Sequence, residues 1–600
     1  MRRASLPLGI LVIGGFVATW HLGSLGPGNP YYAAATRSMS TDWRHFFFAS
    51  FDPGGFLSVD KPPFGLWLQA LSARLLGYAP WSVALPDVIA GTLAPVLLWS
   101  LICRRLGQVA GTVAALALIL TPISVAVERD TVFESILTLL LLGAVGTAIR
   151  AITTGRWRWT LATAILLGLA FNTKFWAGLL VLPALTLAFA AQREKSLAAR
   201  QLIVGALALA AVSVSWVAVV DHTPAAQRPF VGGSATNREA DLVTHYDGLA
   251  RLGWFGATRA PGEGSITQPT TGPDGGPGPL RLVSPELAAQ AGWLLPPALA
   301  GAAWLVRSRR RWDAEQRTLA LILGGWGLTG YAVFSLEGGT FHAYYLAELA
   351  PPLAAWAGVA AGALWTRLSR GGAGVWRLPM VVAVTAAWEA WILTSAPSGF
   401  LWLLPGLGLA PLLAMATGWS RRARPLARAM PAIAASATAL LLALPPAAWV
   451  GSTLAASSDG LTPYAGPRSS APTGAAQADP TRLGLAAFLV AHQDGWRFVA
   501  ATATARTAAP LIILSGAPVM AMGGFAGADP VLANEPLSDI LRRRQVRFFL
   551  LSASGAESRF ARSIELDVRG SCPAQRPGAP ALGGLVPALP PGEALYLCSA

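Results

Sequence analysis

The sequence predicts an α-helical polytopic membrane protein with about 13 transmembrane helices, followed by a small C-terminal extracytoplasmic α/β domain. Two observations lead to this prediction. Of the 600 residues, 54% are hydrophobic and only 12% are charged, whereas a soluble globular chain carries about 25% charged residues. Apolar windows of about 20 residues, long enough to cross a bilayer, recur through residues 1–450 and are absent after them.

The apolar runs define the predicted spans. We expect the first run to be a retained helix, because no small-residue cleavage site follows it. The break after the fifth run, at Asn172-Thr173-Lys174, is short. The predicted spans are residues 5–22, 83–102, 109–127, 132–149, 159–173, 175–191, 201–220, 289–306, 318–335, 342–365, 378–394, 400–418 and 429–450.

The distribution of basic residues predicts the orientation. Cytoplasmic loops carry an excess of Lys and Arg, and with Arg2 and Arg3 inside, every second loop holds a basic cluster. The clusters are Arg104-Arg105, Arg150/Arg156/Arg158, Arg193/Lys195/Arg200, Arg307 with Arg309–Arg311, Arg367/Arg370/Arg377 and Arg421/Arg422/Arg424/Arg428. We therefore expect a multi-pass protein of the inner (plasma) membrane with its C-terminus outside. The same clusters account for the formal net charge of +15 without nucleic-acid binding.

The predicted domains follow from this topology. Residues 1–450 form the transmembrane domain, with long external loops at 23–80 and 221–288; the second, rich in Gly and Pro, is a candidate lid. Residues 451–480 are rich in Ser, Ala, Gly and Pro and are predicted to be a linker, and residues 481–600 are predicted to be the α/β domain. In that domain we expect a helix at 483–491 and strands at 498–503, 511–514, 546–551 and 594–597.

A lysine in the first external loop is a candidate anion-binding residue. Lys61 stands between Asp60 and two prolines, Pro62 and Pro63, which stiffen the backbone. A lysine held in this way presents a point charge to an anion such as a phosphate. The alternative is a local charge pair with Asp60 at the level of the lipid headgroups.

Two further ionisable residues stand at predicted membrane boundaries. Glu134 lies in an otherwise apolar helix and is interpreted as a site carboxylate facing the bundle interior, with a snorkelling side chain as the alternative. His342 begins a span and is equally consistent with a structural role and with a role in the site. No zinc-binding spacing is found.

The two cysteines of the predicted external domain, Cys572 and Cys598, are expected to form a disulfide, because disulfides persist in an oxidising compartment. The alternative is two free thiols. The third cysteine, Cys103, lies in a predicted span.

Several motifs together resemble a known family. They are Asn29-Pro30-Tyr31-Tyr32-Ala33, Arg37-Ser38-Met39, Phe51-Asp52-Pro53-Gly54-Gly55, Asp60-Lys61-Pro62-Pro63-Phe64-Gly65, Gly168-Leu169-Ala170-Phe171-Asn172-Thr173-Lys174, Tyr246-Asp247-Gly248-Leu249-Ala250-Arg251, Phe341-His342-Ala343-Tyr344-Tyr345, Met522-Gly523-Gly524-Phe525 and Val546-Arg547-Phe548-Phe549-Leu550. In this combination the chain resembles the bacterial branch of glycosyltransferase family 39. These are enzymes of the GT-C fold related to protein O-mannosyltransferases and to the lipid A aminoarabinose transferase, with the YkcA/YkcB-type mannosyltransferases as the closest branch.

The resemblance implies a sugar donor carried on a polyprenyl monophosphate and transfer at the outer face. It implies that Lys61 contacts the donor phosphate, because Asp60-Lys61-Pro62 resembles the E-K-P motif of the aminoarabinose transferase, and that Glu134 stands where the family often has Asp. Asp60 and His342 are the expected ligands of an optional divalent cation, and no other cofactor is expected. The residues expected to bind substrate are Asn29, Tyr32, Arg37, Lys61, His342 and Tyr345.

At one position the chain departs from the family. Many relatives place an acidic pair before the Tyr-Ala of the first loop, and one of its members acts as the catalytic base; here the pair is replaced by Gly28-Asn29. An amide does not accept a proton from a hydroxyl. The expected base is therefore Asp52 or Asp60, unless the acceptor needs no strong base.

The sequence thus predicts a membrane glycosyltransferase. It would move a mannose-like hexose or an aminopentose from a polyprenyl-phosphate donor to an extracytoplasmic lipid, protein or cell-envelope glycan. The alternative from another class is a transporter or flippase of a polyprenyl lipid or a solute, for which internal repeats and helices broken at mid-membrane are expected. A second alternative is a surface binding or scaffolding role for the tail.

Overall fold

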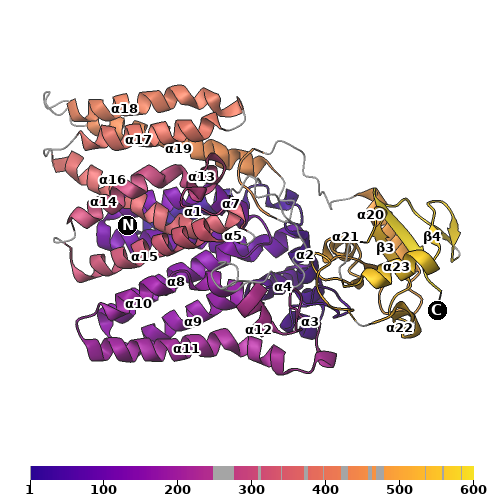
Figure 1. Cartoon of the computed structure of the whole chain (residues 1–600). Coiled ribbons are helices and arrows are strands. Elements are labelled where there is room, and N and C mark those ends of the chain that lie inside the picture. Colours follow the sequence, from indigo (N-terminus) through magenta and orange to yellow (C-terminus); the bar gives the residue numbers. More distant parts are fainter. Residues whose placement is uncertain are drawn as a thin grey trace.

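Figure 1 shows the computed structural model, in which a bundle of long, roughly parallel helices is joined to a smaller mixed domain. The structure describes residues 2–246, 276–308, 312–338, 341–370, 376–395, 398–419, 430–456, 462–467, 479–533, 535–556, 560–582 and 584–599. The middle of the predicted lid, most of the predicted linker and the motif at Asp247–Arg251 lie outside these residues.

The bundle places a helix in every predicted span. Its helices are α1 (Arg2–Thr19), α5 (Pro80–Leu106), α6 (Gln108–Ile119), α7 (Pro122–Glu128), α8 (Glu134–Thr154), α9 (Trp157–Lys174), α10 (Leu182–Ala190), α11 (Lys195–His222), α14 (Leu295–Ser308), α15 (Ala314–Leu336), α16 (Ala350–Arg370), α17 (Arg377–Thr394), α18 (Leu404–Trp419) and α19 (Met430–Ala455). Among the described residues, eight helices are long and apolar enough to cross a membrane, or nine if α6 and α7, bent by 60°, form one span. The protein is therefore a multi-pass membrane protein.

One predicted boundary differs in the structure. The run 175–191 is a five-residue 3-10 turn, Phe175–Leu179, that extends α9, followed by the nine-residue helix α10. The membrane-length helix here is Trp157–Leu179. Phe175, where the α-helix gives way to the 3-10 turn, has a positive φ of 38°, which costs free energy for a bulky side chain.

The depth of each helix in the bundle follows from its burial. About two thirds of the apolar window of the helix at Ala343–Leu368 is buried (67%), whereas only 22% of the α11 window is buried. Exposed apolar side chains such as Leu207 on α11 and Leu328 on α15 are what a lipid-facing surface requires. The Ala343–Leu368 helix is therefore central and α11 is peripheral.

The segments between the spans are themselves folded. The first loop contains α2 (Pro30–Thr41), α3 (Trp43–Phe47) and α4 (Phe64–Leu76). The second contains α12 (Glu239–Asp241), a π-helical turn at Leu242–Tyr246 and, after residue 275, α13 (Pro285–Ala291). A parallel bridge between Leu57 and Phe230 joins the two loops. In Figure 1, α2, α3 and α4 gather at the end of the bundle next to the C-terminal domain.

The C-terminal domain is built on a five-stranded sheet of order β2-β1-β3-β7-β4. Strand β1 is parallel to β2 and β3, and β7 is antiparallel to β3 and β4. The elements are α20 (Pro480–Ala491), β1 (Ala500–Thr502), α21 (Ala505–Ser515), β2 (Val519–Ala521), α22 (Leu537–Arg542), β3 (Phe548–Ser552), α23 (Arg562–Ser571), β4 (Ala574–Gln575), β5 (Pro580–Ala581), β6 (Gly584–Leu585) and β7 (Glu593–Leu597).

The prediction of a strand at 511–514 is wrong, because these residues form the last turns of α21. The helix is capped by the Thr504 side chain and ends at Gly516, which adopts φ of 68°. A short apolar run fits a buried strand or a buried helix equally well, so the caps decide between them. The strands expected around 498–503, 546–551 and 594–597 correspond to β1, β3 and β7.

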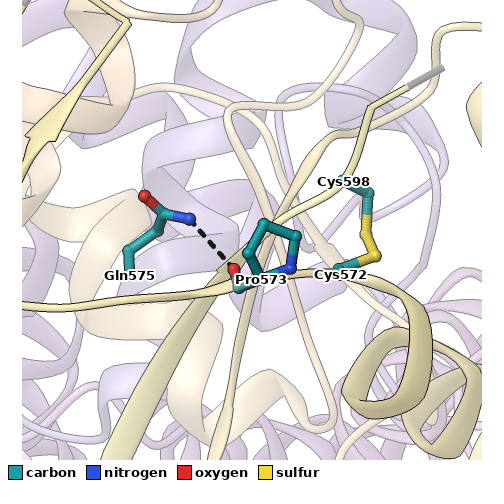
Figure 2. The surroundings of a disulfide bond; sticks show 4 residues. All are labelled: Cys572, Pro573, Gln575 and Cys598. Carbon is teal, nitrogen blue, oxygen red and sulfur yellow. Dashed lines mark hydrogen bonds between the residues drawn. A yellow bond between two sulfur atoms is a disulfide. The ribbon is translucent and has the colours of Figure 1, made fainter.

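A disulfide links Cys572 at the C-terminal end of α23 to Cys598 after β7, with the two Cα atoms 4.8 Å apart (Figure 2). Figure 2 also shows the Gln575 side chain donating to the Pro573 carbonyl beside this bond. The bond is the pairing expected from the sequence. It ties the last strand of the sheet to the helix that precedes β4.

We predict that thiol labelling of the oxidised protein modifies at most Cys103. The variant Cys598→Ser should lower the free energy of unfolding of the domain by about 3 kcal/mol. Without the disulfide, the two ends of a segment 26 residues apart are no longer tied together in the unfolded chain, which gains conformational entropy. Mass spectrometry of the labelled protein and thermal unfolding measure the two effects. Two additional labelled thiols without reductant would contradict the bond.

Candidate active site

The middle of the first loop is folded back on itself by backbone hydrogen bonds. The N–H of Phe51 donates to the Leu57 carbonyl at 2.8 Å, and the N–H of Val59 donates to the Ala49 carbonyl at 2.9 Å. All four side chains are fully buried. The chain leaves this compact turn at Asp60 and Lys61, whose positions are thus set by the loop core.

Asp60 and Lys61 form a loose pair in which Asp60 is buried and Lys61 is largely buried. The Lys61 Nζ atom lies 3.9 Å from Asp60 Oδ2, and the Lys61 side chain is only 12% exposed. The Asp60 N–H donates to the Tyr31 hydroxyl at 3.3 Å. Asp60 Oδ1, also buried, has no hydrogen-bond partner among the described residues. A buried oxygen without a partner is costly unless a ligand satisfies it, so Asp60 retains an open acceptor position.

Asp52 has a different environment and is not placed to act as a base. Its carboxylate accepts the N–H groups of Gly54 at 2.8 Å, Phe56 at 3.1 Å and Leu57 at 3.0 Å. The residue is completely buried, and burial raises its pKa to about 6 against the opposing effect of these hydrogen bonds. Because both oxygens are occupied by the backbone of its own turn, Asp52 stabilises the loop. Of the two expected bases, only Asp60 has a carboxylate oxygen without a hydrogen-bond partner among the described residues.

Asn29 caps a helix. Its side-chain oxygen accepts the N–H groups of Tyr31 and Tyr32 at the start of α2. Its own N–H donates to Asp130 Oδ1 at 3.0 Å and to Thr131 Oγ1 at 2.9 Å. The structure thus gives Asn29 a role in holding α2 against the bundle, and the substrate contact expected from the sequence stays a prediction.

The preceding residue, Gly28, explains why this chain cannot carry an acidic pair at this place. Gly28 has φ of 66°, and a Cβ atom there would lie 2.8 Å from the Thr131 backbone nitrogen and 2.9 Å from Asp130 Oδ1. A side chain would meet both strain and a clash.

Arg37 contacts the C-terminal domain. Its guanidinium donates to the carbonyl of Ile513 on α21 and lies over the Tyr78 ring at 5.0 Å. These contacts are with protein groups, and the expectation that Arg37 binds substrate stays a prediction. Tyr32, by contrast, points toward the bundle, where its ring packs on Phe133 at 4.8 Å.

Glu134 belongs to a buried ionic cluster. It is the first residue of α8 and is 1% exposed, and its Oε1 atom is paired with Lys174 Nζ from the end of α9. Lys174 Nζ lies 3.7 Å from Glu348 Oε1, and Glu348 is fully buried as well. The snorkelling interpretation of Glu134 is therefore wrong, because the side chain faces the bundle interior and is paired there.

Two tyrosines cover this cluster. Lys174 Nζ lies 4.1 Å from the ring centroid of Tyr345 and 5.0 Å from that of Tyr344. The His342 ring stacks on Tyr344 at 5.3 Å and meets Tyr345 edge-on at 5.4 Å. His342 and Tyr345, which the sequence singled out, are thus joined to Glu134 through Lys174.

Phe133 connects this cluster to the first loop. Its ring packs on Tyr32, and a Cβ atom at Gly65 would lie 2.7 Å from it. Gly65 is four residues after Lys61 and Phe133 is adjacent to Glu134. Phe133, the neighbour of Glu134 in the chain, therefore packs on α4 and α2 of the first loop.

Sequence reasoning missed four buried acidic or basic residues near these groups. Lys174 and Glu348 complete the cluster around Glu134. Glu239 on α12 is fully buried, and Asp529 of the C-terminal domain accepts the N–H of Gly233 at 2.7 Å. Lys174 carried a usable signal, since a lysine within apolar runs is functional by default. Asp529 and Glu239 carried none, because only tertiary structure brings them toward Asp60.

Asp60 and His342 remain a prediction as metal ligands. Within the part of the chain that the structure describes, no group of three or more His, Cys, Asp or Glu side chains is arranged to hold a metal ion. The described residues therefore do not by themselves assemble a metal site.

Comparisons with known proteins address the family. The family model described as "Dolichyl-phosphate-mannose-protein mannosyltransferase" matches residues 60–217, and the one described as "Putative mannosyltransferase YkcB-like, C-terminal" matches residues 485–566. The chain is 32% identical to "Putative mannosyltransferase YycA" of Bacillus subtilis (strain 168), over 91% of each chain. It is 31% identical to "Putative mannosyltransferase YkcB" of the same organism, over 91% of this chain and 88% of the other.

The chain belongs to this family of membrane glycosyltransferases. The resemblance deduced from the motifs is confirmed, and family membership decides for the transferase over the transporter. As a member of the family, the chain has the fold of a GT-C enzyme.

Solved structures agree on the fold. The crystal structure of ArnT from Cupriavidus metallidurans bound to undecaprenyl phosphate is 16% identical, with a TM-score of 0.51, over 99% of this chain and 97% of that one. The oligosaccharyltransferase of Archaeoglobus fulgidus in the apo form is 13% identical, with a TM-score of 0.52, over 91% of this chain and 69% of that one.

The buried cluster leads to a stability prediction. Lys174→Met should leave Glu134 and Glu348 without this counter-charge and destabilise the protein by about 3–5 kcal/mol. Glu134→Gln should lower the free energy of unfolding by less, because Lys174 remains paired with Glu348. Thermal unfolding in detergent measures both. Lys195→Met is the matched control, since Lys195 is exposed at the start of α11. An equal or larger loss in Glu134→Gln would contradict the arrangement.

Proposed function

We propose that this glycosyltransferase transfers a sugar from a polyprenyl-phosphate donor to the hydroxyl group of an acceptor at the extracytoplasmic face. The observation that carries the proposal is the Asp60-Lys61 pair, at the end of the bundle where the folded loops gather. It combines a largely buried lysine with a buried carboxylate that has one oxygen without a partner among the described residues. The basic clusters in every second loop support the orientation that places the first loop and the C-terminal domain outside the cell membrane. The fold shared with ArnT, whose crystal structure holds undecaprenyl phosphate, supports the donor class.

In the proposed reaction the acceptor hydroxyl attacks the anomeric carbon of the donor sugar. A new carbon–oxygen bond forms, and the bond between the anomeric carbon and the phosphate oxygen breaks with its electron pair. The proton of the hydroxyl passes to Asp60, which acts as general base. The polyprenyl monophosphate leaves with the additional negative charge, which Lys61 stabilises.

The surroundings fit these roles. Pro62 and Pro63 restrict the backbone after Lys61 and so limit the positions of its ammonium group. Burial excludes water, which strengthens the attraction between this group and a phosphate. A protein with a mobile, exposed lysine would lose this advantage to solvent screening.

The other residues are assigned to orientation of the substrates. We propose that Glu134 holds Lys174 in place and that Tyr32, His342 and Tyr345 line the side of the site toward the bundle. A divalent cation at Asp60 and His342 is kept as a separate proposal, and no step depends on it. The mannosyltransferase names of both relatives favour mannose as the sugar; the acceptor is proposed only as a lipid, protein or glycan of the envelope.

The first test concerns the phosphate. Lys61→Ala should lower transfer from a synthetic polyprenyl-phosphate mannose by about 100-fold or more and weaken binding of undecaprenyl monophosphate. Turnover in proteoliposomes and native mass spectrometry measure the two effects. The control is Lys195→Ala, which should behave as the unmodified protein. Normal turnover by Lys61→Ala would refute the role of Lys61.

The second test separates the two aspartates of the first loop. Asp60→Asn should bind undecaprenyl monophosphate normally and lose transfer by about 100-fold or more, because an amide does not take up the proton. Asp52→Asn should retain transfer per folded molecule but unfold at lower temperature, because its NH₂ group faces backbone N–H donors at about 1–3 kcal/mol cost. The reverse pattern would assign the base to Asp52.

A further inference from the structure

The C-terminal domain is packed onto the first loop of the membrane domain at two places. One lies between α21 and α2, which are side by side in Figure 1. The other is the turn formed by residues 52–57, which we call the Asp52 turn because the Asp52 carboxylate accepts its backbone N–H groups. Both places precede Asp60 and Lys61 in the chain.

The Asp52 turn receives a hydrogen bond from the C-terminal domain. Nη2 of Arg497 donates to the Gly54 carbonyl at 2.7 Å, and Nη1 donates to Gln545 Oε1 at 3.4 Å within the domain. The Gly54 N–H donates to Asp52 Oδ1 at 2.8 Å. Both polar backbone groups of Gly54 are therefore bonded, one within the turn and the other to the C-terminal domain.

The next residue of the domain, Phe498, packs against the same turn. Phe498 is 1% exposed, and its ring meets the Phe56 ring edge-on at 5.7 Å. A Cβ atom at Gly54 would clash with Cε1 of Phe498 and would lie 2.9 Å from Asp52 Oδ1. Only glycine at position 54 therefore allows the turn to approach the domain this closely.

Three aromatic rings make the second contact. The ring of Tyr31 on α2 stacks on the ring of Phe51 at 5.1 Å, and it packs on Phe525 of the C-terminal domain at 4.8 Å. The Tyr31 hydroxyl accepts the Asp60 N–H at 3.3 Å. Phe525 thus contacts the side chain that holds the backbone of Asp60.

The segment between these contacts depends on them for its shape. Residues 48–63 lie between α3 and α4 and are held by isolated bridges and single hydrogen bonds, in place of a helix or a sheet. Such a segment opens locally at a lower free energy than the core of a helix or a strand. Each contact with the C-terminal domain therefore makes this segment harder to open.

We propose that the C-terminal domain is a clamp on the first loop, and that Arg497 and Phe525 are positioning residues for sugar transfer. Arg497 holds the Asp52 turn and Phe525 holds Tyr31. The backbone at Lys61 is thereby fixed, and its ammonium group is preorganised for the donor phosphate. The inference rests on the proposed function, in which Lys61 stabilises that phosphate.

A pair of variants tests each contact. Arg497→Ala removes the hydrogen bond to Gly54, whereas Arg497→Lys keeps a donor for it. Phe525→Ala removes the ring that packs on Tyr31, whereas Phe525→Leu keeps an apolar side chain there. Arg542→Ala is the matched control, because Arg542 is an exposed arginine of the same domain whose ion pair lies within α22.

Hydrogen–deuterium exchange of the whole protein measures the clamp directly. In both alanine variants, exchange of peptides covering residues 48–60 should become about fivefold faster or more, because a contact that opposes opening is lost. Peptides covering β1 and β3 should exchange as in the unmodified protein, which shows that the domain remains folded. Arg497→Lys, Phe525→Leu and Arg542→Ala should stay close to the unmodified protein. Unchanged exchange of residues 48–60 in both alanine variants overturns the proposal.

Binding and turnover connect the clamp to transfer. Both alanine variants should bind undecaprenyl monophosphate about fivefold more weakly or worse and should lower kcat with polyprenyl-phosphate mannose by about 10-fold or more. The two conservative variants should restore most of each loss. Normal binding and turnover in variants with faster exchange would refute the positioning role. Faster exchange in the alanine variants without transfer by the unmodified protein would instead refute the proposed function and leave the clamp in place.

Discussion

The hydrogen bonds from the Asn29 N–H to Asp130 and Thr131 fix the start of α2, and the parts of the protein outside the bundle depend on that position. One end of α2 is held on the loop between α7 and α8, and its side chains then contact two partners. Tyr32 packs on Phe133 in the bundle, while Arg37 donates to Ile513 in the C-terminal domain. A shift of α2 would therefore displace the Asp60 segment and the C-terminal domain together.

Buried charges in this protein are placed where another charge or the backbone compensates them. The chain has 45 Lys and Arg residues, of which three are lysines, and two of those three, Lys61 and Lys174, are buried beside carboxylates. Lysine is a compact point charge on a flexible stem, unlike the planar guanidinium of arginine. The two lysines differ in their surroundings: Lys174 is paired with two glutamates, Glu134 and Glu348, whereas Lys61 Nζ lies 3.9 Å from a carboxylate oxygen of Asp60.

Several residues that the motifs singled out hold the loops in shape. Asn29 caps α2, Asp52 satisfies three backbone N–H groups of its turn, and Arg37 binds the C-terminal domain. A buried loop needs such groups, because its backbone donors have no water to bond. A polar residue in such a motif can therefore either hold the loop in shape or contact substrate. The sequence does not distinguish these two roles, whereas the hydrogen-bond partners in the structure reveal the first.

The sequence alone determined the membrane class, the helical runs and the family, because hydropathy, basic loops and local motifs are properties of contiguous residues. It also singled out Asp60, Lys61 and Glu134 as candidate site residues. It also determined the cysteine pairing, since only two cysteines share the predicted compartment. Tertiary structure alone decided that residues 511–514 form a helix and that both carboxylate oxygens of Asp52 are occupied by its own turn. It also decided that Lys174 pairs with both Glu134 and Glu348, and that Asp529 accepts the N–H of Gly233, 296 positions away in the second loop. These facts depend on contacts between segments that are distant in the sequence. The free energy of burying a charge or a backbone donor is set by the partners that folding brings to it, and a local sequence pattern does not encode those partners.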